Sequence, residues 1–332
     1  MILANLFHKV KLIDIMAKEV LFHDDFSQGF LEGKKTGSMW KVFKMGPVKA
    51  DDGIVTVKDN VLHVVPKGVN HETGLPAFSG TASKGMMGKN DHMKWNCNAQ
   101  YKSGRKSGVE LVSGKTLVVE AVIGVNSFGM ENHPFGSLVE DPKGDPRLGA
   151  GVLVTQDLPT MTIFDFFVTE NQIFAVYERA ELLRLFKGRY ASFSFAVPIA
   201  SHKKGDFNTL SLKFNKEKNT VQWYVDGEMK YELLKPGCII DRQYMLIDNG
   251  GKDTIINLTR INAALGMFSL MDGARKGTGL VNLSGSKGFF NPQVGEPQPP
   301  VFFDEESKKE SRLFGQGVEL MCKDFSIYYE DY

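Results

Sequence analysis

The sequence predicts an all-β protein in which two antiparallel sheets pack face to face. Three observations predict it: strand-like alternation recurs along the chain, hairpin turns separate the alternating segments, and helix-like segments are nearly absent. The segment NTVQWYVDGEMKYEL (219–233) combines the first two. Residues 221–225 alternate between two faces, and residues 229–233 form the returning strand. Asp226-Gly227 favours a tight hairpin turn between them, because glycine adopts a positive φ at little cost.

Further segments have the same alternation and are bounded by turn residues. They are 53–66, which we expect to be a hairpin turning at Asp59-Asn60, and then 115–125, 149–157, 161–169, 172–180, 191–199, 207–215, 265–272 and 322–331. The only helix-like stretch is short, around residues 180–186. Strands at near-regular spacing indicate a sandwich rather than alternating strand–helix units.

Composition places the chain among ordinary globular proteins and excludes some partners. Of its 332 residues, 42% are hydrophobic and 24% charged, which suits a sizeable core. The net charge is +1, from 40 basic and 39 acidic residues, so we expect neither a nucleic-acid nor a membrane partner. Cys97, Cys238 and Cys322 lie far apart without a paired spacing, and we expect them to be buried, reduced thiols.

The chain is predicted to form one domain. Residues 1–17 are interpreted as an N-terminal extension and 18–332 as a single domain, with long loops at 79–108 and 285–312 that are rich in turn-forming and charged residues. The N-terminus lacks an uninterrupted apolar run of the kind found in signal peptides. No stretch approaches the ~18 apolar residues of a membrane span. We therefore expect a cytoplasmic protein.

Several motifs resemble those of one large superfamily. FNTLSLKFNKEKNTVQWYVDGEMKYEL (207–233), FHDDFSQGF with the Trp40 that follows it, and CKDFSIYYED (322–331) occur in the order seen in concanavalin A-like jelly rolls, particularly laminarinase-type family 16 glycoside hydrolases. The resemblance covers about residues 20–331. It implies a two-sheet antiparallel jelly-roll sandwich in which the first and the closing strands lie side by side.

The same resemblance implies a catalytic strand that this chain does not reproduce. Those hydrolases carry Glu-x-Asp-x-Glu or Glu-x-Asp-x-x-Glu, and the matching segment here is TIFDFFVTENQ. With Asp165 on the central aspartate, Ile163 and Phe167 stand where the glutamates belong. A shifted alignment puts Asp165 and Glu170 at the ends, but the residues around Glu170 are typical of a turn. Retaining hydrolysis needs two carboxyls, so standard family 16 activity is not expected.

A closer likeness is to uncharacterised single-domain bacterial jelly-roll proteins. These carry runs similar to NHPFG, DPRLGAG, FDFFVTENQIFAVYER and YASFSFAVPIA. This likeness supports the fold and leaves the function open.

Asp165 is the first candidate for a catalytic residue. Its apolar neighbours would desolvate the carboxyl and raise its pKa, which suits proton transfer near neutral pH. Tyr177, Glu178 and Arg179 lie on the next predicted strand, with Tyr177 and Arg179 on one face and Glu178 on the other. We expect Asp165 and either Tyr177 or Glu178 to project into a concave cleft. The alternative is a hydrogen-bonded core aspartate beside ordinary cross-strand pairs.

Loop residues supply further candidates. His133 in MENHPFG is a candidate general base, and His92 in NDHMKW a candidate ligand-binding group. Arg147 follows Asp145 on a turn set by proline, where it either grips an anionic ligand or clasps the aspartate. Both histidines also fit a solvated or backbone-bonded role.

Three aromatic residues and two aspartates complete the set. Trp95, Trp223 and Tyr224 are candidates, with Arg179, for ligand binding, since aromatic rings stack on sugar faces. The resemblance suggests Asp324 and Asp25 as ligands of a structural calcium ion. No other metal or cofactor motif is present in the sequence.

Two classes of function remain open. The first is an enzyme that uses the cleft for acid–base chemistry without a cofactor on a small, partly apolar molecule. The second is a carbohydrate-binding module or a divergent glycoside hydrolase. Loss of the glutamate pair favours the first, and the sequence identifies neither the ligand nor the oligomeric state.

Overall fold

The structure is a computed structural model. It describes residues 18–33, 36–45, 48–79, 93–103, 106–181, 184–275, 278–280, 289–290, 297–298 and 313–331. The predicted N-terminal extension, 1–17, lies outside the described residues.

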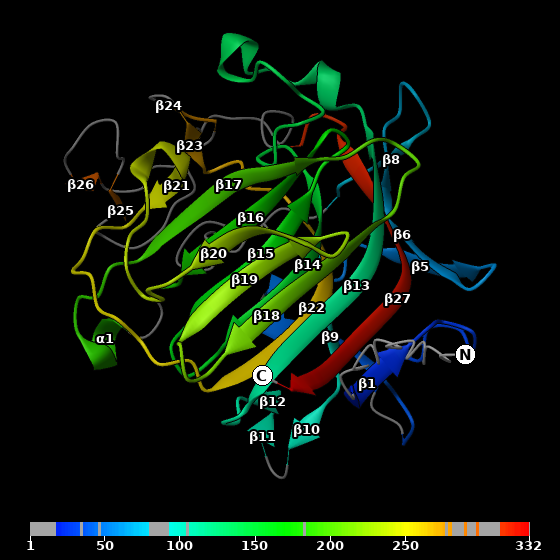
Figure 1. The fold of residues 1–332 in the computed structure, drawn as a ribbon. Coiled ribbons are helices and arrows are strands. Elements are labelled where there is room, and N and C mark those ends of the chain that lie inside the picture. The colour runs from blue at the N-terminus through cyan, green and yellow to red at the C-terminus, as the bar shows by residue number, and fades with distance from the viewer. Residues whose placement is uncertain are drawn as a thin grey trace, which may run out of the picture.

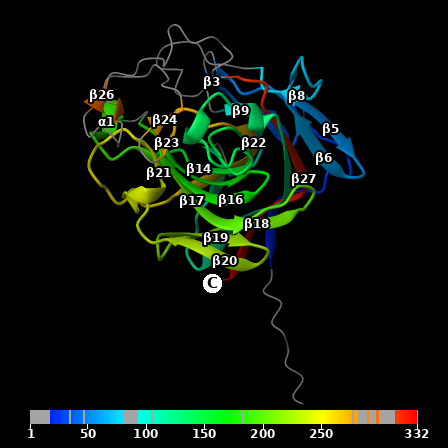
Figure 2. The ribbon, with the colours of Figure 1, turned by 90° about the horizontal axis from the view of Figure 1, so that it is seen from above.

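Two antiparallel sheets form the sandwich, and Figures 1 and 2 show them as two stacked layers. The smaller sheet has the order β20-β19-β18-β13-β27-β6-β5, with β1 beside β27. Its strands are β1 (Glu19–Asp24), β5 (Ile54–Lys58), β6 (Val61–Val65), β13 (Lys115–Phe128), β18 (Asn208–Asn215), β19 (Thr220–Val225), β20 (Glu228–Leu233) and β27 (Gly317–Asp331). The pairing of β1 with β27 confirms that the first and the closing strands are adjacent.

The larger sheet lies behind the smaller one in Figure 1. Its order is β2-β9-β22-β14-β15-β16-β17-β21-β25-β26, with β12 beside β22. Its strands are β2 (Trp40–Val42), β9 (Met93–Ala99), β12 (Val109–Glu110), β14 (Ala150–Asp157), β15 (Thr162–Val168), β16 (Gln172–Arg179), β17 (Phe193–Ser201), β21 (Met245–Asp248), β22 (Arg260–Phe268), β25 (Phe289–Phe290) and β26 (Pro297–Gln298). The fold is the predicted two-sheet jelly-roll sandwich.

Short elements connect these strands. They are β3 (Lys44–Met45), β4 (Val48–Lys49), β7 (Gly68–Val69), β8 (Pro76–Ala77), β10 (Lys102–Ser103), β11 (Lys106–Ser107), β23 (Ala274–Arg275), β24 (Thr278–Gly279), α1 (Arg184–Lys187) and the 3-10 turns η2 (Met130–Asn132), η3 (Gly136–Leu138) and η4 (Arg242–Tyr244). The helix-like stretch of the sequence becomes the single turn of α1. No helix in the described ranges is long enough to cross a membrane.

Alternation builds the main core between the sheets. Val221, Trp223 and Val225 of β19 point inward, as their spacing predicted, and meet Phe164 and Phe166 of the larger sheet. Both predicted hairpin turns are present, because positive φ angles occur at Asp59 and Asn60 (52° and 59°) and at Asp226 and Gly227 (51° and 81°). Burial of these large side chains, at roughly 25 cal/mol per Å² of apolar surface, supplies the main stabilisation.

The structure places strands within both segments that were predicted to be long loops. The segment 79–108 is not one loop, because β9 lies within it, pairs with β2 and β22, and buries Trp95 and Cys97. The turn-rich composition around β9 concealed a strand that has apolar residues on one face only. Within 285–312 only residues 289–290 and 297–298 are described, and they form β25 and β26.

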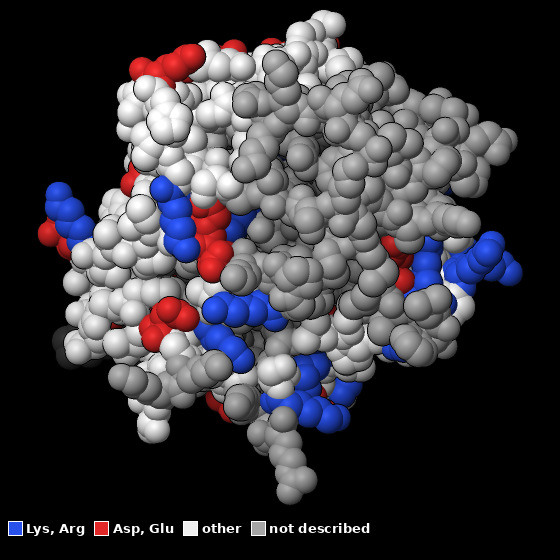
Figure 3. Space-filling model, turned by 180° about the vertical axis from the view of Figure 1, so that it is seen from behind, with Lys and Arg blue, Asp and Glu red and all other residues white. Residues whose placement is uncertain are grey.

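The described part of the rear face carries charged side chains of both signs (Figure 3). In the view from behind, acidic and basic side chains are interspersed where residues are described (Figure 3). This distribution agrees with the near-zero net charge.

Candidate active site

A second cluster of buried apolar residues lies on the face of the larger sheet that is turned away from the smaller sheet. We call this the outer face. Its buried apolar members are Ala150, Val152, Val154, Phe167, Phe174, Val176, Ala196, Leu246, Ala264, Phe268 and Leu270. Both faces of these central strands are therefore apolar, which explains why the sequence of β14 to β17 shows nearly continuous hydrophobic runs.

Asp165 lies within this apolar surface. In β15, Phe164 and Phe166 belong to the main core, so the alternation of the strand turns Asp165 and Phe167 to the outer face. The side chain of Asp165 is only 1% exposed. Its strand neighbour across the ladder is Val176 of β16.

The ladder between β14 and β15 changes at Asp165. One carboxylate oxygen, Oδ1, accepts a hydrogen bond from the backbone N–H of Thr155 at 2.9 Å, and the Thr155 hydroxyl donates to the carbonyl of Phe164. The carbonyl of Asp165 accepts from Nε1 of Trp223 at 2.9 Å, across the core. Side chains thus replace ladder bonds here and fix the position of the carboxyl.

Glu178 brings a second carboxyl to the same face. It lies on β16 opposite Ile163, two residues beyond the partner of Asp165. Such diagonal neighbours lie ~7–8 Å apart, with their Cβ atoms somewhat closer, within reach of long side chains. Ser194 of β17, the cross-strand partner of Glu178, donates its hydroxyl hydrogen bond to Glu178 Oε1.

The two carboxyls have unlike environments. Burial raises the pKa of Asp165 well above its usual range, the charge of Glu178 raises it further, and the hydrogen bond from Thr155 lowers it. Burial also raises the pKa of Glu178, and the Ser194 hydroxyl opposes that rise by stabilising the carboxylate. Two adjacent carboxyls whose surroundings separate their pKa values can serve as an acid and a base.

Tyr177 and Arg179 do not join this pair, so of the two residues expected beside Asp165 only Glu178 shares its face. Both point into the main core, because they alternate with Glu178. The Tyr177 hydroxyl accepts from the N–H of Gly237 at 2.6 Å and donates to the carbonyl of Cys238 at 3.1 Å. Arg179 Nη1 donates to the carbonyl of Gly237 at 3.0 Å. These contacts anchor the segment after β20 and serve packing.

The three aromatic candidates also lie away from the outer face. Trp223 is buried in the core, and Trp95 is buried beside Phe30, with ring centroids 6.3 Å apart. Tyr224 is on the smaller sheet, where Lys213 Nζ lies 4.8 Å from its ring centroid. Alternation or the choice of sheet turns each of these rings away from the face that carries Asp165, and their stacking on a sugar stays a prediction.

The loop candidates make local contacts. Nδ1 of His133 accepts from the N–H of Phe135 at 3.2 Å, and the two rings stack with centroids 6.1 Å apart. Arg147 clasps Asp145, with Nη2 2.6 Å from Oδ2, and its Nη2 also donates to the carbonyl of Leu138. These partners are all on the loop itself and not on the strands of the carboxyl pair, and His92 lies outside the described residues.

Asp25 and Asp324 have separate partners. Asp25 accepts from the N–H of Ser27 at 3.0 Å, whereas Asp324 lies 2.8 Å from Nε2 of His23 and accepts from Ser326. Across the described ranges, no three side chains of the metal-binding types converge on one point. A structural calcium ion stays a prediction.

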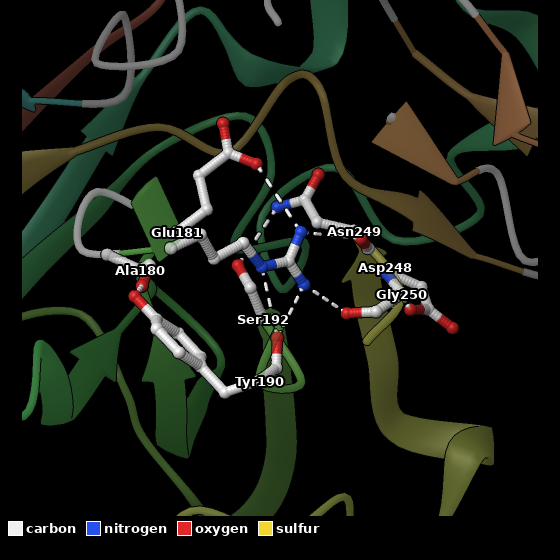
Figure 4. A network of polar contacts seen from close by, with 8 residues as sticks. Ala180, Glu181, Tyr190, Ser192, Asp248, Asn249 and Gly250 are labelled. Carbon is white, nitrogen blue, oxygen red and sulfur yellow. Dashed lines mark hydrogen bonds and ion pairs between the residues drawn. The ribbon is translucent and has the colours of Figure 1, made fainter. Parts of the chain in front are cut away.

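A polar network fixes the edge of the sheet near Ser194 (Figure 4). Arg184 of α1 donates to the carbonyls of Tyr190 and Asn249 at 3.0 and 2.9 Å, and the Tyr190 hydroxyl donates to Ala180 at 2.6 Å. The N–H of Asn249 donates to the carbonyl of Ser192. This network ties the end of β21 to the start of β17, the strand that carries Ser194.

Sequence reasoning missed Thr155 and Ser194. Each touches a carboxyl only because strand pairing sets it beside the neighbouring strand, and no local pattern marks either residue. The composition of a single strand could not reveal them.

Comparison with known proteins identifies the family. Residues 23–331 match a model described as "Family of unknown function (DUF6081)". The chain belongs to this family. A curated relative of this DUF6081 member, "Uncharacterized protein L829" of Acanthamoeba polyphaga mimivirus, is 24% identical over 290 residues. That match covers 69% of this chain and 63% of the relative, so the chain spans less than two thirds of the relative's length.

Solved structures similar to this DUF6081 member include jelly-roll glucanases. An endo-1,3-beta-glucanase from Streptomyces sioyaensis has a TM-score of 0.48 at 11% identity, covering 95% of this chain and 97% of the other. The catalytic domain of an endo-1,3-beta-glucanase (laminarinase) from Thermotoga petrophila has a TM-score of 0.42 at 12% identity, covering 96% and 99%. A Bacillus licheniformis beta-glucanase has a TM-score of 0.41 at 8% identity, covering 94% and 98%.

Proposed function

We propose that this protein moves protons on a small, partly apolar molecule at the outer face, with Asp165 and Glu178 as the acid–base pair. The observation that carries the proposal is the placement of both carboxyls on one apolar sheet face, where burial raises both pKa values. A carboxyl in such a place is costly unless it binds or transfers something. The pair supplies a proton donor and a proton acceptor without a cofactor.

The environments of the two carboxyls assign the roles of acid and base. Asp165 is the acid, because it is the more deeply buried of the two and the neighbouring negative charge favours its protonated form. Glu178 is the base, because the Ser194 hydroxyl stabilises its ionised form. Efficient general acids and bases have pKa values near the working pH, and burial shifts both carboxyl pKa values upward, in that direction.

The apolar part of the ligand packs on the residues around the pair. Val176 of β16 lies beside Asp165 across the ladder. Phe167 of β15 and Phe174 of β16 extend the apolar surface along the two strands. Ligand sites typically combine such a surface with a few placed polar groups. The sugar-binding alternative has less support, since none of the three aromatic rings predicted to stack on sugars is on the outer face.

The test uses small carbonyl compounds with an apolar substituent. Exchange of the α-protons of phenylpyruvate, phenylacetaldehyde and 4-phenyl-2-butanone with D2O is followed by proton NMR and corrected for the buffer rate. We expect Asp165→Asn and Glu178→Gln to slow the catalysed exchange by ~10²–10⁴-fold, the usual contribution of a general acid or base. Melting temperatures confirm that both variants are folded.

Asp157→Asn is the matched control. Asp157 is a fully buried carboxyl of β14 with a raised pKa, but its Oδ2 accepts from the N–H of Thr259 and it does not face the pair. We expect this variant to keep the wild-type exchange rate. Wild-type rates in both carboxamide variants, or no catalysed exchange with any probe, contradict the proposal.

A further inference from the structure

An open pocket lies at the β2 edge of the larger sheet, away from the carboxyl pair. Its volume is about 480 Å³, within the range of small-molecule sites. Phe30, Val42, Val55 and Trp95 provide its apolar surface. No lining residue comes from β14 to β17, the strands that carry the proposed proton-transfer site.

Backbone hydrogen bonds hold the walls of this pocket. The N–H of Phe43 donates to the carbonyl of Asn96 at 2.8 Å, on one side of β9. The segment before β5 also pairs with β9, since Asp52 N–H donates to Lys94 at 2.9 Å and Asn96 N–H donates to Ala50 at 3.0 Å. The pocket is therefore bounded by paired backbone.

Trp95 presents an unused donor to the pocket. Of the three tryptophans, Trp40 donates its Nε1–H to Asp24 at 2.7 Å and Trp223 donates to the carbonyl of Asp165 at 2.9 Å. Within the described chain Nε1 of Trp95 donates to no residue, although the side chain is only 1% exposed. Trp95 Nε1 is also not among the fully enclosed polar atoms that lack a partner, so a ligand or water in the pocket can accept its hydrogen bond.

Gly53 keeps the space in front of this donor free of side chains. A Cβ at Gly53 would lie 2.5 Å from Cδ1 and 3.0 Å from Nε1 of Trp95. Any other residue at this position would press on the indole edge that faces the pocket. The glycine is thus required by the close approach of the chain to the donor.

Charged side chains of both signs line the same pocket. Lys44 and Lys67 supply two cations, and Glu32 and Asp51 supply two anions. Among the described residues, none of the four forms an ion pair, although opposite charges line one small space. Such an arrangement complements a ligand that carries both charges at once.

We propose that this pocket binds a small zwitterion with an apolar side chain, such as an aromatic α-amino acid. The ligand's carboxylate accepts the Trp95 indole hydrogen bond and faces Lys44 and Lys67. Its ammonium group faces Glu32 and Asp51. Its apolar side chain packs on the neighbouring apolar lining. This inference is independent of the proton-transfer site.

The test measures the binding of L-phenylalanine to the full chain labelled with 5-fluorotryptophan. Three fluorine resonances are expected, and Trp95→Phe identifies the one from Trp95. L-phenylalanine should shift that resonance alone. Phenethylamine, which lacks the carboxylate, should bind about tenfold more weakly, because it loses both the acceptor for the indole N–H and the charge that faces Lys44 and Lys67. 3-Phenylpropionate, which lacks the ammonium group, should bind only about threefold more weakly than L-phenylalanine, as expected for the loss of exposed ion pairs.

Variants separate the two charges. Asp51→Asn should lower the affinity for L-phenylalanine and leave the affinity for 3-phenylpropionate unchanged. Lys67→Gln should lower the affinity for both of these compounds and leave the affinity for phenethylamine unchanged. Lys58→Gln, an exposed lysine of β5 outside the pocket lining, is the control and should bind like the wild type. If Trp95→Phe does not fold, equilibrium dialysis with radiolabelled L-phenylalanine measures the affinity of the wild type and of the two charge variants instead.

Three outcomes overturn the proposal. One is the absence of any Trp95 shift and of any retained radiolabel at millimolar L-phenylalanine. The second is equal binding of phenethylamine and L-phenylalanine. The third is an equal shift with glucose, which would make the site one for neutral polyhydroxylated ligands.

Discussion

The raised pKa of Asp165 predicts how the stability of the protein depends on pH, and Asp165→Asn isolates that contribution. Burial and the charge of Glu178 keep the native carboxyl protonated at pH values where the unfolded chain has lost the proton. The unfolded state then binds fewer protons than the native state, so the free energy of unfolding falls as pH rises. Asparagine resembles the protonated carboxyl and cannot titrate.

The expected magnitude follows from one proton. Between about pH 4, the ordinary range of an aspartate, and the raised pKa, the wild type loses up to ~1.4 kcal/mol of unfolding free energy per pH unit through this group. The Asp165→Asn variant does not lose this free energy, because asparagine does not titrate. Its side-chain carboxamide oxygen can still accept from the N–H of Thr155, so the hydrogen bond that measures 2.9 Å in the wild type is retained. The difference, variant minus wild type, should therefore rise with pH and level off above the raised pKa.

Urea unfolding followed by tryptophan fluorescence, at half-unit steps from about pH 4.5 to 8, measures this difference. Titrating groups other than Glu178 are present in both proteins and cancel, and Glu178 meets an uncharged partner in both for as long as Asp165 is protonated. Asp206→Asn, at an exposed loop position, is the matched control and should show a difference that is constant with pH. A constant or falling difference for Asp165→Asn would refute the reasoning, because it would mean that the native carboxyl is ionised.

Substitutions at neighbouring contacts, and one substrate, give four further predictions. Glu178→Gln should lower the pKa of Asp165, because it removes the neighbouring charge, and carbon-13 NMR of the carboxyl measures the change. Tyr177→Phe should cost about 1–3 kcal/mol of unfolding free energy by leaving two buried backbone groups unsatisfied, yet keep the proton-exchange rate. Trp223→Phe should cost about 2–4 kcal/mol, since it removes core volume and the hydrogen bond to the Asp165 carbonyl, and urea unfolding checks both values. Laminarin incubated with the protein should release no reducing sugar above background, since apolar residues occupy the expected glutamate positions; release that Asp165→Asn abolishes would contradict this.

Local sequence determined most of the strands and their turns. Alternation of period two in β19 and β15 sets which side chains share a face, and Asp226-Gly227 can adopt the positive φ angles that the hairpin needs. The same rule separates Tyr177 from Glu178. Such features depend only on near neighbours in the chain, so the sequence reveals them directly.

The site depended on contacts that no local pattern encodes. Asp165 is close to Glu178, Thr155 and Trp223 only because β14, β15 and β16 pair in one register and the opposite sheet packs behind them. β9 was hidden for a related reason, since Trp95 becomes a core residue only when β2 and β22 lie on either side of it. The sequence determined which residues alternate; the pairing of strands and sheets decided which side chains meet, because those contacts join residues far apart in the chain.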